Sequence, residues 1–259
     1  MDHALAADSL LDMRRNGRIE ANLPVDLRPM DLAAAYSIQT LVVGGMLPED
    51  AQPIGYKCAC TSEIAQQALR IDRPVFGRLL SHTTSPTGAK LPAARFTHRV
   101  IEAEFGFQMA GDVPERAGGH TVGSITPYVN AVIPAIEIVD YRYADWTVGA
   151  LSIAADNAIH GWWIEGRPLA DWHDIDLAAT EVVVRSNGEV VTTGSGANVL
   201  EHPLNALAWL ASELPRFGGR LRAGDRVTTG VATDVFEADS GDVITAEFAR
   251  LGSVELTFT

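Results

Sequence analysis

The sequence predicts an α+β fold in which helices near the N-terminus pack against a mainly β remainder. Two observations lead to this prediction. Apolar residues recur at helical spacing within residues 3–22 and 31–46, and strand patterns dominate from about residue 100 onward. The clearest strand is IEAEFGFQM (101–109), where apolar side chains alternate with Glu, Glu, Gly and Gln.

The N-terminal part contains three expected helices and one strand. Asp31 is the expected N-cap of the second helix, and Thr61 or Ser62 caps a short third helix, SEIAQQALRI. Before it, IGYKCAC (54–60) has a strand pattern. Residues 74–99 are rich in turn residues and receive no assignment.

The β part is expected to contain, in order, a Gly- and Pro-rich loop over 111–127, a strand over 131–143, a hairpin over 180–194, a helix after His202-Pro203 and three strands from 223 to the end. Asn187-Gly188 suits the type I′ turn of such a hairpin. The sequence shows no repeat or linker, so we expect residues 1–259 to form one compact unit. Its mainly helical part would cover 1–70 and its mainly β core 100–259.

Composition excludes several classes of partner. The net charge of −13 argues against nucleic acid and against an anionic membrane surface. No run is apolar and long enough for a transmembrane helix, and the N-terminus lacks signal-peptide features, so we expect a cytoplasmic protein. Cys58 and Cys60 are expected to be small buried apolar residues.

Three glutamates form the first candidate site. Glu102 and Glu104 share one face of their strand, and for that strand alone a water-facing polar face is the simpler interpretation. Glu137 differs, because it lies in a run that is apolar on both faces, and a buried carboxylate needs compensation. Either an arginine or a divalent cation such as Mg²⁺ or Mn²⁺, shared by the three carboxylates, would provide it.

Lys57 is the second candidate. The chain has 18 arginines but only two lysines, so each lysine is a candidate for a position where arginine would not serve. Small residues, Gly55 and Ala59, are its neighbours on the same strand face and leave space above it. The lysine either forms a structural ion pair or acts near the carboxylates as a proton donor or a charge for an enolate.

Several motifs occur in an order that resembles a known family. They are GYKCACTSE, FGRLL, IEAEFGFQM, AVIPAIEIVDYRYADW, ADN, NGEVVTTGSGANVLEHPLNALAWLA, LRAGDRVTTG and LGSVELTF. Together they resemble the 2-oxopent-4-enoate hydratase/4-oxalocrotonate decarboxylase family of the fumarylacetoacetase-like superfamily. The resemblance covers nearly the whole chain and is strongest in its C-terminal third.

The resemblance implies a fold and a site. The core would be a mixed β-sandwich or barrel-like sheet of the fumarylacetoacetase C-terminal type, with N-terminal helices packed around it. It implies that Glu102, Glu104 and Glu137 are the Mg²⁺ or Mn²⁺ ligands and that Lys57 is the active-site lysine. It also implies that substrate meets three residues, namely Thr229, Asn157 and Ile159.

The activity implied is that of a metal-dependent hydro-lyase. Such an enzyme adds water to a 2-hydroxy-2,4-dienoate through a metal-stabilised enolate and yields a 4-hydroxy-2-oxo acid. The alternatives are a 2-oxo acid decarboxylase of the 4-oxalocrotonate type, a related C–C hydrolase or tautomerase, and a non-catalytic partner subunit. The resemblance further implies a homo-oligomer that associates with a related pathway enzyme.

Two segments depart from the family pattern. Ser81-His82 stand where relatives commonly carry an acidic residue, and Ile159-His160-Gly161-Trp162-Trp163 replace small or serine residues. We interpret the tryptophans as core residues of a packed strand. His160 is either part of that core or a catalytic group that supplies a proton or contacts an anion. Changes that cluster at the pocket suit either an altered substrate, the interpretation that we favour, or a paralogue that has lost activity.

Overall fold

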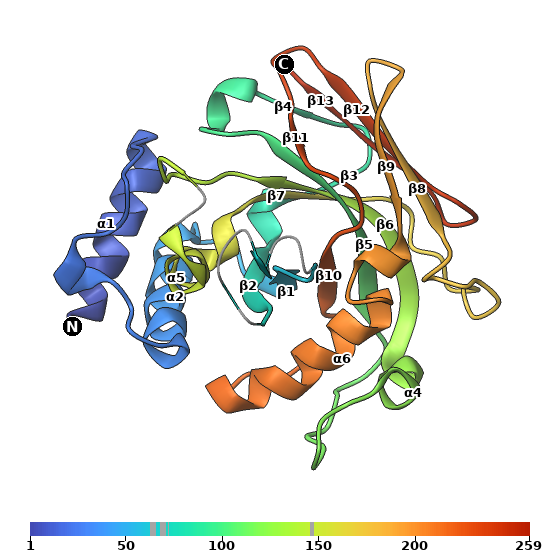
Figure 1. Ribbon diagram of the computed structural model, residues 1–259, viewed down its shortest axis with the longest axis horizontal. Helices are drawn as coiled ribbons and strands as arrows, with labels where there is room; N and C mark the ends of the chain where they lie inside the picture. The colour runs from blue at the N-terminus through green and yellow to red at the C-terminus, as the bar shows by residue number, and fades with distance from the viewer. Residues whose placement is uncertain (63–65, 68–70, 72, 146–147) are drawn as a thin grey trace.

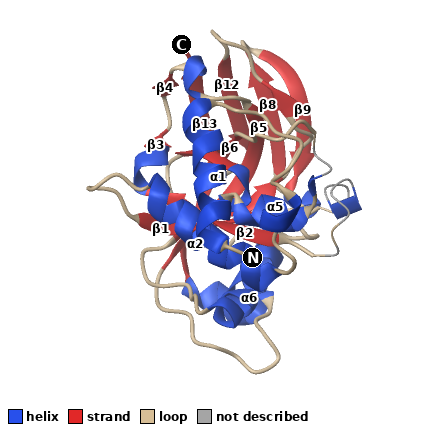
Figure 2. Cartoon of the chain, turned by 90° about the vertical axis from the view of Figure 1, so that its left-hand side faces the viewer, coloured by secondary structure: helices blue, strands red, loops and turns tan. Residues whose placement is uncertain are grey.

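Two β-sheets form the centre of the molecule, and the main helices lie around the larger sheet (Figure 1). The computed structural model describes residues 1–62, 66–67, 71, 73–145 and 148–259. Helices α2 and α5 lie beside the strand β2, and α6 lies beside β10 (Figures 1 and 2). This arrangement of helices on a curled mixed sheet with a second sheet against it is the predicted α+β fold.

The helices are, in chain order, α1 (His3–Asn16), α2 (Leu32–Met46), α4 (Val122–Ile125), α5 (Ala150–Ala155) and α6 (Pro203–Glu213). The first helix is shorter than the predicted 3–22, because Gly17 adopts a left-handed conformation (φ 60°) that ends it. Asp31 caps α2 as predicted, since its carboxylate accepts a hydrogen bond from the Ala34 amide at 2.8 Å. Much of the predicted helix SEIAQQALRI lies outside the described residues.

The larger sheet has the strand order β2-β1-β10-β5-β6-β7-β3, and β11 also pairs with β5. Its strands are β1 (Pro53–Ala59), β2 (Val75–Leu80), β3 (Thr84–Pro86), β5 (Val100–Met109), β6 (Val129–Val139), β7 (His160–Glu165), β10 (Arg226–Val231) and β11 (Phe236–Glu237). The central pair β5–β6 is antiparallel over its whole length. The strand β7 begins at His160, so the segment with the two tryptophans is a strand as interpreted.

The smaller sheet has the order β4-β13-β12-β8-β9. Its strands are β4 (Ala89–Leu91), β8 (Glu181–Ser186), β9 (Glu189–Ser195), β12 (Val243–Phe248) and β13 (Gly252–Phe258). The predicted hairpin is confirmed, because Asn187 and Gly188 both have the positive φ angles, 53° and 88°, that a type I′ turn requires. β12 and β13 supply two of the three predicted C-terminal strands, and β10 of the larger sheet supplies the third.

The two sheets pack on each other and bury the strand IEAEFGFQM. Phe105 of β5 meets Phe248 of β12 edge-on, with ring centroids 5.2 Å apart. Phe105 belongs to the face opposite Glu102 and Glu104. The face of the two glutamates meets Lys57 of β1 and Thr228 of β10, two strands of the same curled sheet. The water-facing interpretation of Glu102 and Glu104 is wrong: Glu104 is fully buried and Glu102 half-buried. Alternation shows which residues share a face, but the packing of segments distant in sequence decides whether that face meets water.

Two loop assignments also change. The predicted loop 111–127 contains the short helix α4, which Thr121 and Ser124 close with a reciprocal capping box. Residues 74–99, left unassigned, form the strands β2, β3 and β4 and two 3-10 turns, Ser81–Thr83 and Ala93–Arg95. None of the described helices combines the length and apolar character needed to cross a bilayer.

Candidate metal centre

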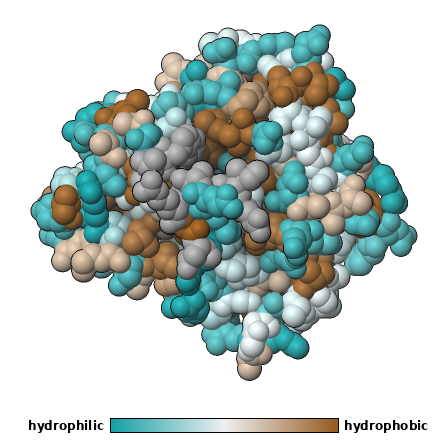
Figure 3. Space-filling model, viewed as in Figure 1, coloured by the Kyte–Doolittle hydropathy of each residue, from teal (hydrophilic) through white to brown (hydrophobic). Residues whose placement is uncertain are grey.

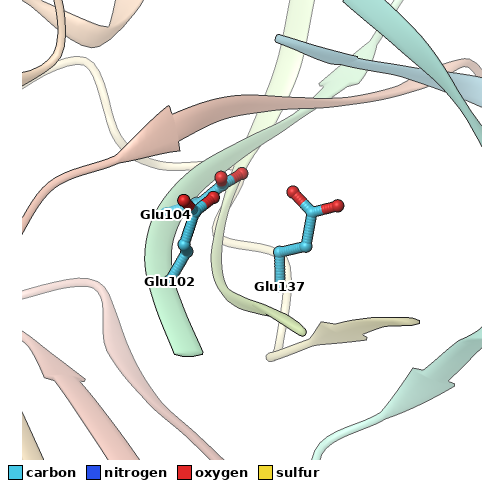
Figure 4. Close-up of side chains that lie close together, drawn as sticks. All are labelled: Glu102, Glu104 and Glu137. Carbon is cyan, nitrogen blue, oxygen red and sulfur yellow. The ribbon is translucent and has the colours of Figure 1, made fainter. Parts of the chain in front are cut away.

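Strand register brings the three glutamates together. Glu102 on β5 pairs directly with Glu137 on β6, and Glu104 lies two residues further along the same face of β5. Their carboxylates converge (Figure 4), and one oxygen from each lies within 4.8 Å of the others. Like charges directly opposite each other destabilise a sheet, so this cluster needs a positive partner.

Lys57 supplies one positive charge. It lies on β1, its side chain is almost fully buried, and its Nζ lies 2.8 Å from Glu137 Oε2. The ammonium also donates a hydrogen bond to the Ala158 carbonyl at 3.0 Å. Burial disfavours the charged amine, but the negative charges of Glu137, Glu102 and Glu104 outweigh it, so the pKa of Lys57 is raised. Lys57 is therefore protonated near neutral pH.

The carboxylates divide into one that is stabilised as an anion and two that are not. Burial opposes ionisation of Glu137, but Lys57 and a hydrogen bond from His160 outweigh it and lower its pKa. Burial and the neighbouring carboxylate of Glu137 raise the pKa of Glu104 well above its ordinary value. The pKa of Glu102 is also raised, by burial and by Glu137, although Lys57 acts in the opposite direction.

The residues present fit a divalent cation. Three carboxylates and one ammonium leave a formal charge of −2 when all are ionised, which one divalent ion neutralises. Glu104 Oε1 is buried and has no hydrogen-bond partner among the described residues, so it is available as a ligand. Oxygen-only donors on rigid strands suit hard cations such as Mg²⁺ or Mn²⁺.

His160 lies directly behind Glu137. Its Nδ1 is 2.8 Å from Glu137 Oε1 and its Nε2 is 3.1 Å from Thr83 Oγ1, and the ring is fully buried. Burial is the main cause that lowers the pKa of His160, so the ring is neutral. Since an ionised Glu137 can only accept, Nδ1 carries the proton and Nε2 accepts from the Thr83 hydroxyl. A histidine held in this way orients the carboxylate that it contacts.

A strained turn precedes His160. Asn157, Ala158 and Ile159 all have left-handed backbone angles (φ 51°, 49° and 53°). Non-glycine residues rarely adopt this conformation, because it costs about 1–3 kcal/mol per residue. The turn aims the Ala158 carbonyl at Lys57. Gly77 permits it, because a Cβ there would lie 2.6 Å from the Asn157 carbonyl oxygen.

The structure places the predicted substrate residues around this turn and on β10. The Asn157 side chain accepts from the Arg78 amide at 2.7 Å and donates to the Arg78 carbonyl at 3.1 Å. Thr229 donates to the Phe105 carbonyl at 2.9 Å. Ile159 is buried next to Ala158, whose carbonyl accepts the hydrogen bond from Lys57. Contact of Asn157, Thr229 and Ile159 with substrate stays a prediction.

The sequence did not single out Thr228 and Thr83. Thr228 Oγ1 donates a short hydrogen bond to Glu104 Oε2. The strand register places Thr228 on the glutamate face, because it pairs with Gly106 of β5 and with Lys57 of β1, before the bulge that precedes Val231. The sequence pattern of β10 alone does not reveal this register. Thr83 follows Ser81-His82 in the 3-10 turn. Only its contact with His160 indicates a role at the candidate site.

The remaining atypical residues have structural contacts. Ser81 Oγ accepts a hydrogen bond from the Gln52 amide at 3.0 Å. Trp163 is fully buried, which confirms its interpretation as a core residue, and Trp162 donates to Ser85 Oγ at 3.0 Å. Both cysteines are free thiols; Cys58 is buried as expected, whereas Cys60 is only partly buried.

Cavity size does not mark this site. A surface pocket of about 870 Å³ lies between α2 and the turn Leu214–Phe217, and its lining includes Tyr56, Phe76 and Arg78 but none of the three glutamates. Tyr56 and Lys57 are adjacent on β1 and therefore point to opposite sheet faces. The buried charge cluster, rather than this pocket, identifies the candidate centre.

Known proteins resemble the chain over nearly its full length. Residues 58–259 match the family model described as fumarylacetoacetate (FAA) hydrolase C-terminal. The chain is 32% identical over 253 residues to a 2-keto-4-pentenoate hydratase of Paraburkholderia xenovorans, covering 98% of this chain and 93% of the relative. It is 33% identical over 233 residues to a 4-oxalocrotonate decarboxylase of Pseudomonas putida, covering 90% and 88%.

A solved structure is similar in both fold and sequence. It is the 4-oxalocrotonate decarboxylase from Pseudomonas putida G7 complexed with magnesium and adipate, with a TM-score of 0.92 and 30% identity. The alignment covers 99% of this chain and 97% of that chain.

Proposed function

The chain belongs to the fumarylacetoacetate hydrolase family, among relatives named as 2-keto-4-pentenoate hydratases and 4-oxalocrotonate decarboxylases, and from this premise we propose that it is a divalent-metal-dependent hydratase. The substrate would be a 2-hydroxy-2,4-dienoate and the product a 4-hydroxy-2-oxo acid. The observation that carries the proposal is the buried trio of carboxylates within 4.8 Å of one another, with Lys57 bonded to one of them. A magnesium complex of a relative supports the choice of metal.

Each residue would have a separate role. Glu102, Glu104 and Glu137 hold Mg²⁺ or Mn²⁺, which when bound supplies Lewis-acid stabilisation of negative charge on a substrate oxygen. Glu102 is only half-buried, so we place the substrate on its side of the cluster. Lys57, fixed by Glu137 and the Ala158 carbonyl, offers a positive charge and a proton to the enolate carbon or oxygen. His160 keeps Glu137 ionised and in place.

Decarboxylation is the second candidate, and the sequence comparison favours it equally. Identity to the decarboxylase relative, 33%, is the same within one per cent as identity to the hydratase relative, 32%. Stabilising an enolate also assists loss of CO₂ from a vinylogous β-keto acid, so the metal and Lys57 serve both reactions. The substrate assay must therefore separate them.

The test is the ultraviolet decay of 2-hydroxypenta-2,4-dienoate with chelator-treated protein, before and after Mg²⁺ or Mn²⁺ is added. Decay that metal restores, with 4-hydroxy-2-oxopentanoate as product, supports the hydratase. Decay of 2-oxohex-3-enedioate with CO₂ release and no hydration supports the decarboxylase. Metal binding without either reaction contradicts both, and a protein that binds no metal points to a non-catalytic partner subunit.

The assembly and the location stay predictions. We propose a homo-oligomer that associates with a related pathway enzyme in the cytoplasm. Light scattering of the purified protein, alone and mixed with that enzyme, measures the subunit count and the association.

A further inference from the structure

A small pocket on the other side of His160 carries an excess of positive charge. Its volume is about 340 Å³, near the lower limit for small-molecule sites. Elements from distant parts of the chain form it, and its charged and polar lining residues are Arg14, Arg15, His82, Thr83, Arg95, Asp140 and Arg142. This concentration of arginine is unexpected in a chain whose net charge is −13.

Two of the arginines are balanced by carboxylates. Arg14 Nε lies 2.5 Å from Asp156 Oδ1, and Arg142 forms a short ion pair with Asp140. Both guanidinium groups are more than nine-tenths buried. These two ion pairs are electrically neutral. They therefore do not compensate the charge of the remaining two arginines.

The other two arginines lie exposed at the rim. Arg15 donates only to the Gly45 carbonyl, at 3.3 Å, and the Arg95 guanidinium lies 4.5 Å from the centre of the Trp162 ring. Neither pairs with a carboxylate within the described ranges of the chain. Together they leave a formal charge of +2 on a pocket of this size.

Two buried nitrogen atoms in the wall also lack a partner. Arg142 Nε and His82 Nδ1 have no hydrogen-bond partner among the residues that the structure describes. Burial and the charge of Arg14 lower the pKa of Arg142, and burial, Arg95 and His160 lower that of His82. Arg142 Nε is an unsatisfied guanidinium donor in a positive field, which is typical of an anion site.

The pocket wall is joined to the metal centre through His160. Arg14 Nη1 donates to the His160 carbonyl at 3.1 Å, and Thr83, also in the wall, contacts His160 Nε2 at 3.1 Å. His160 in turn contacts Glu137. A ligand in the pocket therefore touches the residues that hold the ring behind a proposed metal ligand.

We propose that this pocket binds a small dianionic oxyanion between Arg15 and Arg95, and that the bound anion braces the residues that hold His160. Tetrahedral oxyanions and short dicarboxylates share the required chemistry. Two negative charges match the two uncompensated arginines, and guanidinium groups bind both kinds of oxyanion in pairs of hydrogen bonds.

Calorimetric titration of chelator-treated protein with sulfate, phosphate or succinate tests the binding. Chloride at matched ionic strength corrects for screening. We expect saturable binding that weakens at least tenfold in the double variant Arg15→Gln/Arg95→Gln and is unchanged in Arg185→Gln, a partly exposed arginine on the smaller sheet. Preference for sulfate and phosphate over succinate identifies a tetrahedral ligand, and the reverse a carboxylate. No saturable binding, or equal binding by the double variant, overturns the proposal.

The proposed effect of the anion on the residues that hold His160 is tested by Mg²⁺ affinity rather than by turnover. Mg²⁺ titrations with and without saturating sulfate should show tighter Mg²⁺ binding when sulfate is present, because the anion holds Arg14 and Thr83 in place and so fixes His160 against Glu137. Linkage requires the same factor in the reverse titration. The increase in Mg²⁺ affinity with sulfate should vanish in Arg15→Gln/Arg95→Gln. Equal Mg²⁺ affinity of the wild type with and without sulfate would overturn the proposal that the anion acts through His160. Neither titration depends on the hydratase activity, so the two proposals can fail separately.

Discussion

Glu104 is the carboxylate that the fold compensates least. It is fully buried, its pKa is raised, and only Thr228 donates to it among its described contacts. In a protein shaped for stability alone, such a residue would be replaced by a neutral one. The free energy that it costs to bury Glu104 without a metal indicates that this residue belongs to a binding site.

The variant Glu104→Gln should therefore stabilise the metal-free protein. We expect a rise in Tm of about 2–4 °C, equivalent to about 1 kcal/mol for a chain of this size, because a neutral amide, unlike the carboxyl group, neither buries a charge nor has to take up a proton on folding. The same variant should lose the stabilisation that Mg²⁺ or Mn²⁺ gives to the wild type. Thermal unfolding with chelator and with metal measures both effects, and Glu189→Gln, exposed on β9, is the control. A metal-free variant less stable than the wild type would contradict this account.

Lys57 should act in chemistry rather than in metal binding. The variant Lys57→Met removes the ammonium between Glu137 and Ala158. We expect turnover to fall by about 10²–10⁴-fold, the usual contribution of a positioned proton donor, while Mg²⁺ still binds. Lys90→Met, at the only other lysine, which is exposed on β4, should keep full activity. Full activity of Lys57→Met would remove the proposed role.

Residue types and spacing were enough to predict part of the site. Glu137 and Lys57 could be found because charges in apolar strands stand out in a sequence. Alternation alone placed Glu102 and Glu104 on a water-facing strand face, and the family resemblance was needed to assign them as metal ligands. Thr228 and Thr83 could not be found, because the pairing of β10 with β5 and a 3-10 turn, rather than a periodic pattern within one segment, direct their side chains. The contact between His160 and Glu137 likewise depends on the register of β6 against β7.

The left-handed turn 157–159 is the element that positions Lys57. The variant Gly77→Ala would place a methyl group 2.6 Å from the Asn157 carbonyl oxygen and push the turn away. We expect a loss of stability of about 1–3 kcal/mol, as for other overpacked sites, and a fall in turnover.

A helix glycine provides the control for this change. A Cβ at Gly44 in α2 meets nothing within 4 Å, so Gly44→Ala should be neutral or stabilise the protein by up to about 1 kcal/mol. Denaturant unfolding and initial rates compare the two variants. If Gly77→Ala matched Gly44→Ala in both, the turn would not be needed to hold Lys57.

Elements were predicted well where the local signal is strong. Asp31, Asn187-Gly188 and His202-Pro203 mark helix starts and a turn, and the structure places these features there. The stretch 74–99 was not assigned, because its strands are short and depend on neighbours distant in sequence, such as β7 and β13. Long-range pairing of this kind leaves no period in the sequence.

At the scale of the molecule, proton and metal binding compete at one buried cluster. The folded protein without metal holds a proton on Glu104 more tightly than the unfolded chain does, because its pKa rises above the ordinary 4.5. The contribution of Glu104 to stability therefore falls as pH rises above this value. The stabilising effect of Glu104→Gln without metal should thus be larger at about pH 8 than at about pH 5.5. Unfolding at both pH values checks this, and an effect that shrinks with rising pH would contradict it.

The measurement that tests the central claim most directly is the binding of Mg²⁺ or Mn²⁺ to the chelator-treated wild type and to Glu137→Gln, by calorimetry. We predict one divalent ion per chain in the wild type, with proton release on binding. Glu137→Gln should lose at least about 1.4 kcal/mol of binding free energy, a tenfold weaker Kd, while its circular dichroism stays that of the wild type. Equal affinity and stoichiometry in the two proteins would show that the three glutamates do not form the metal site.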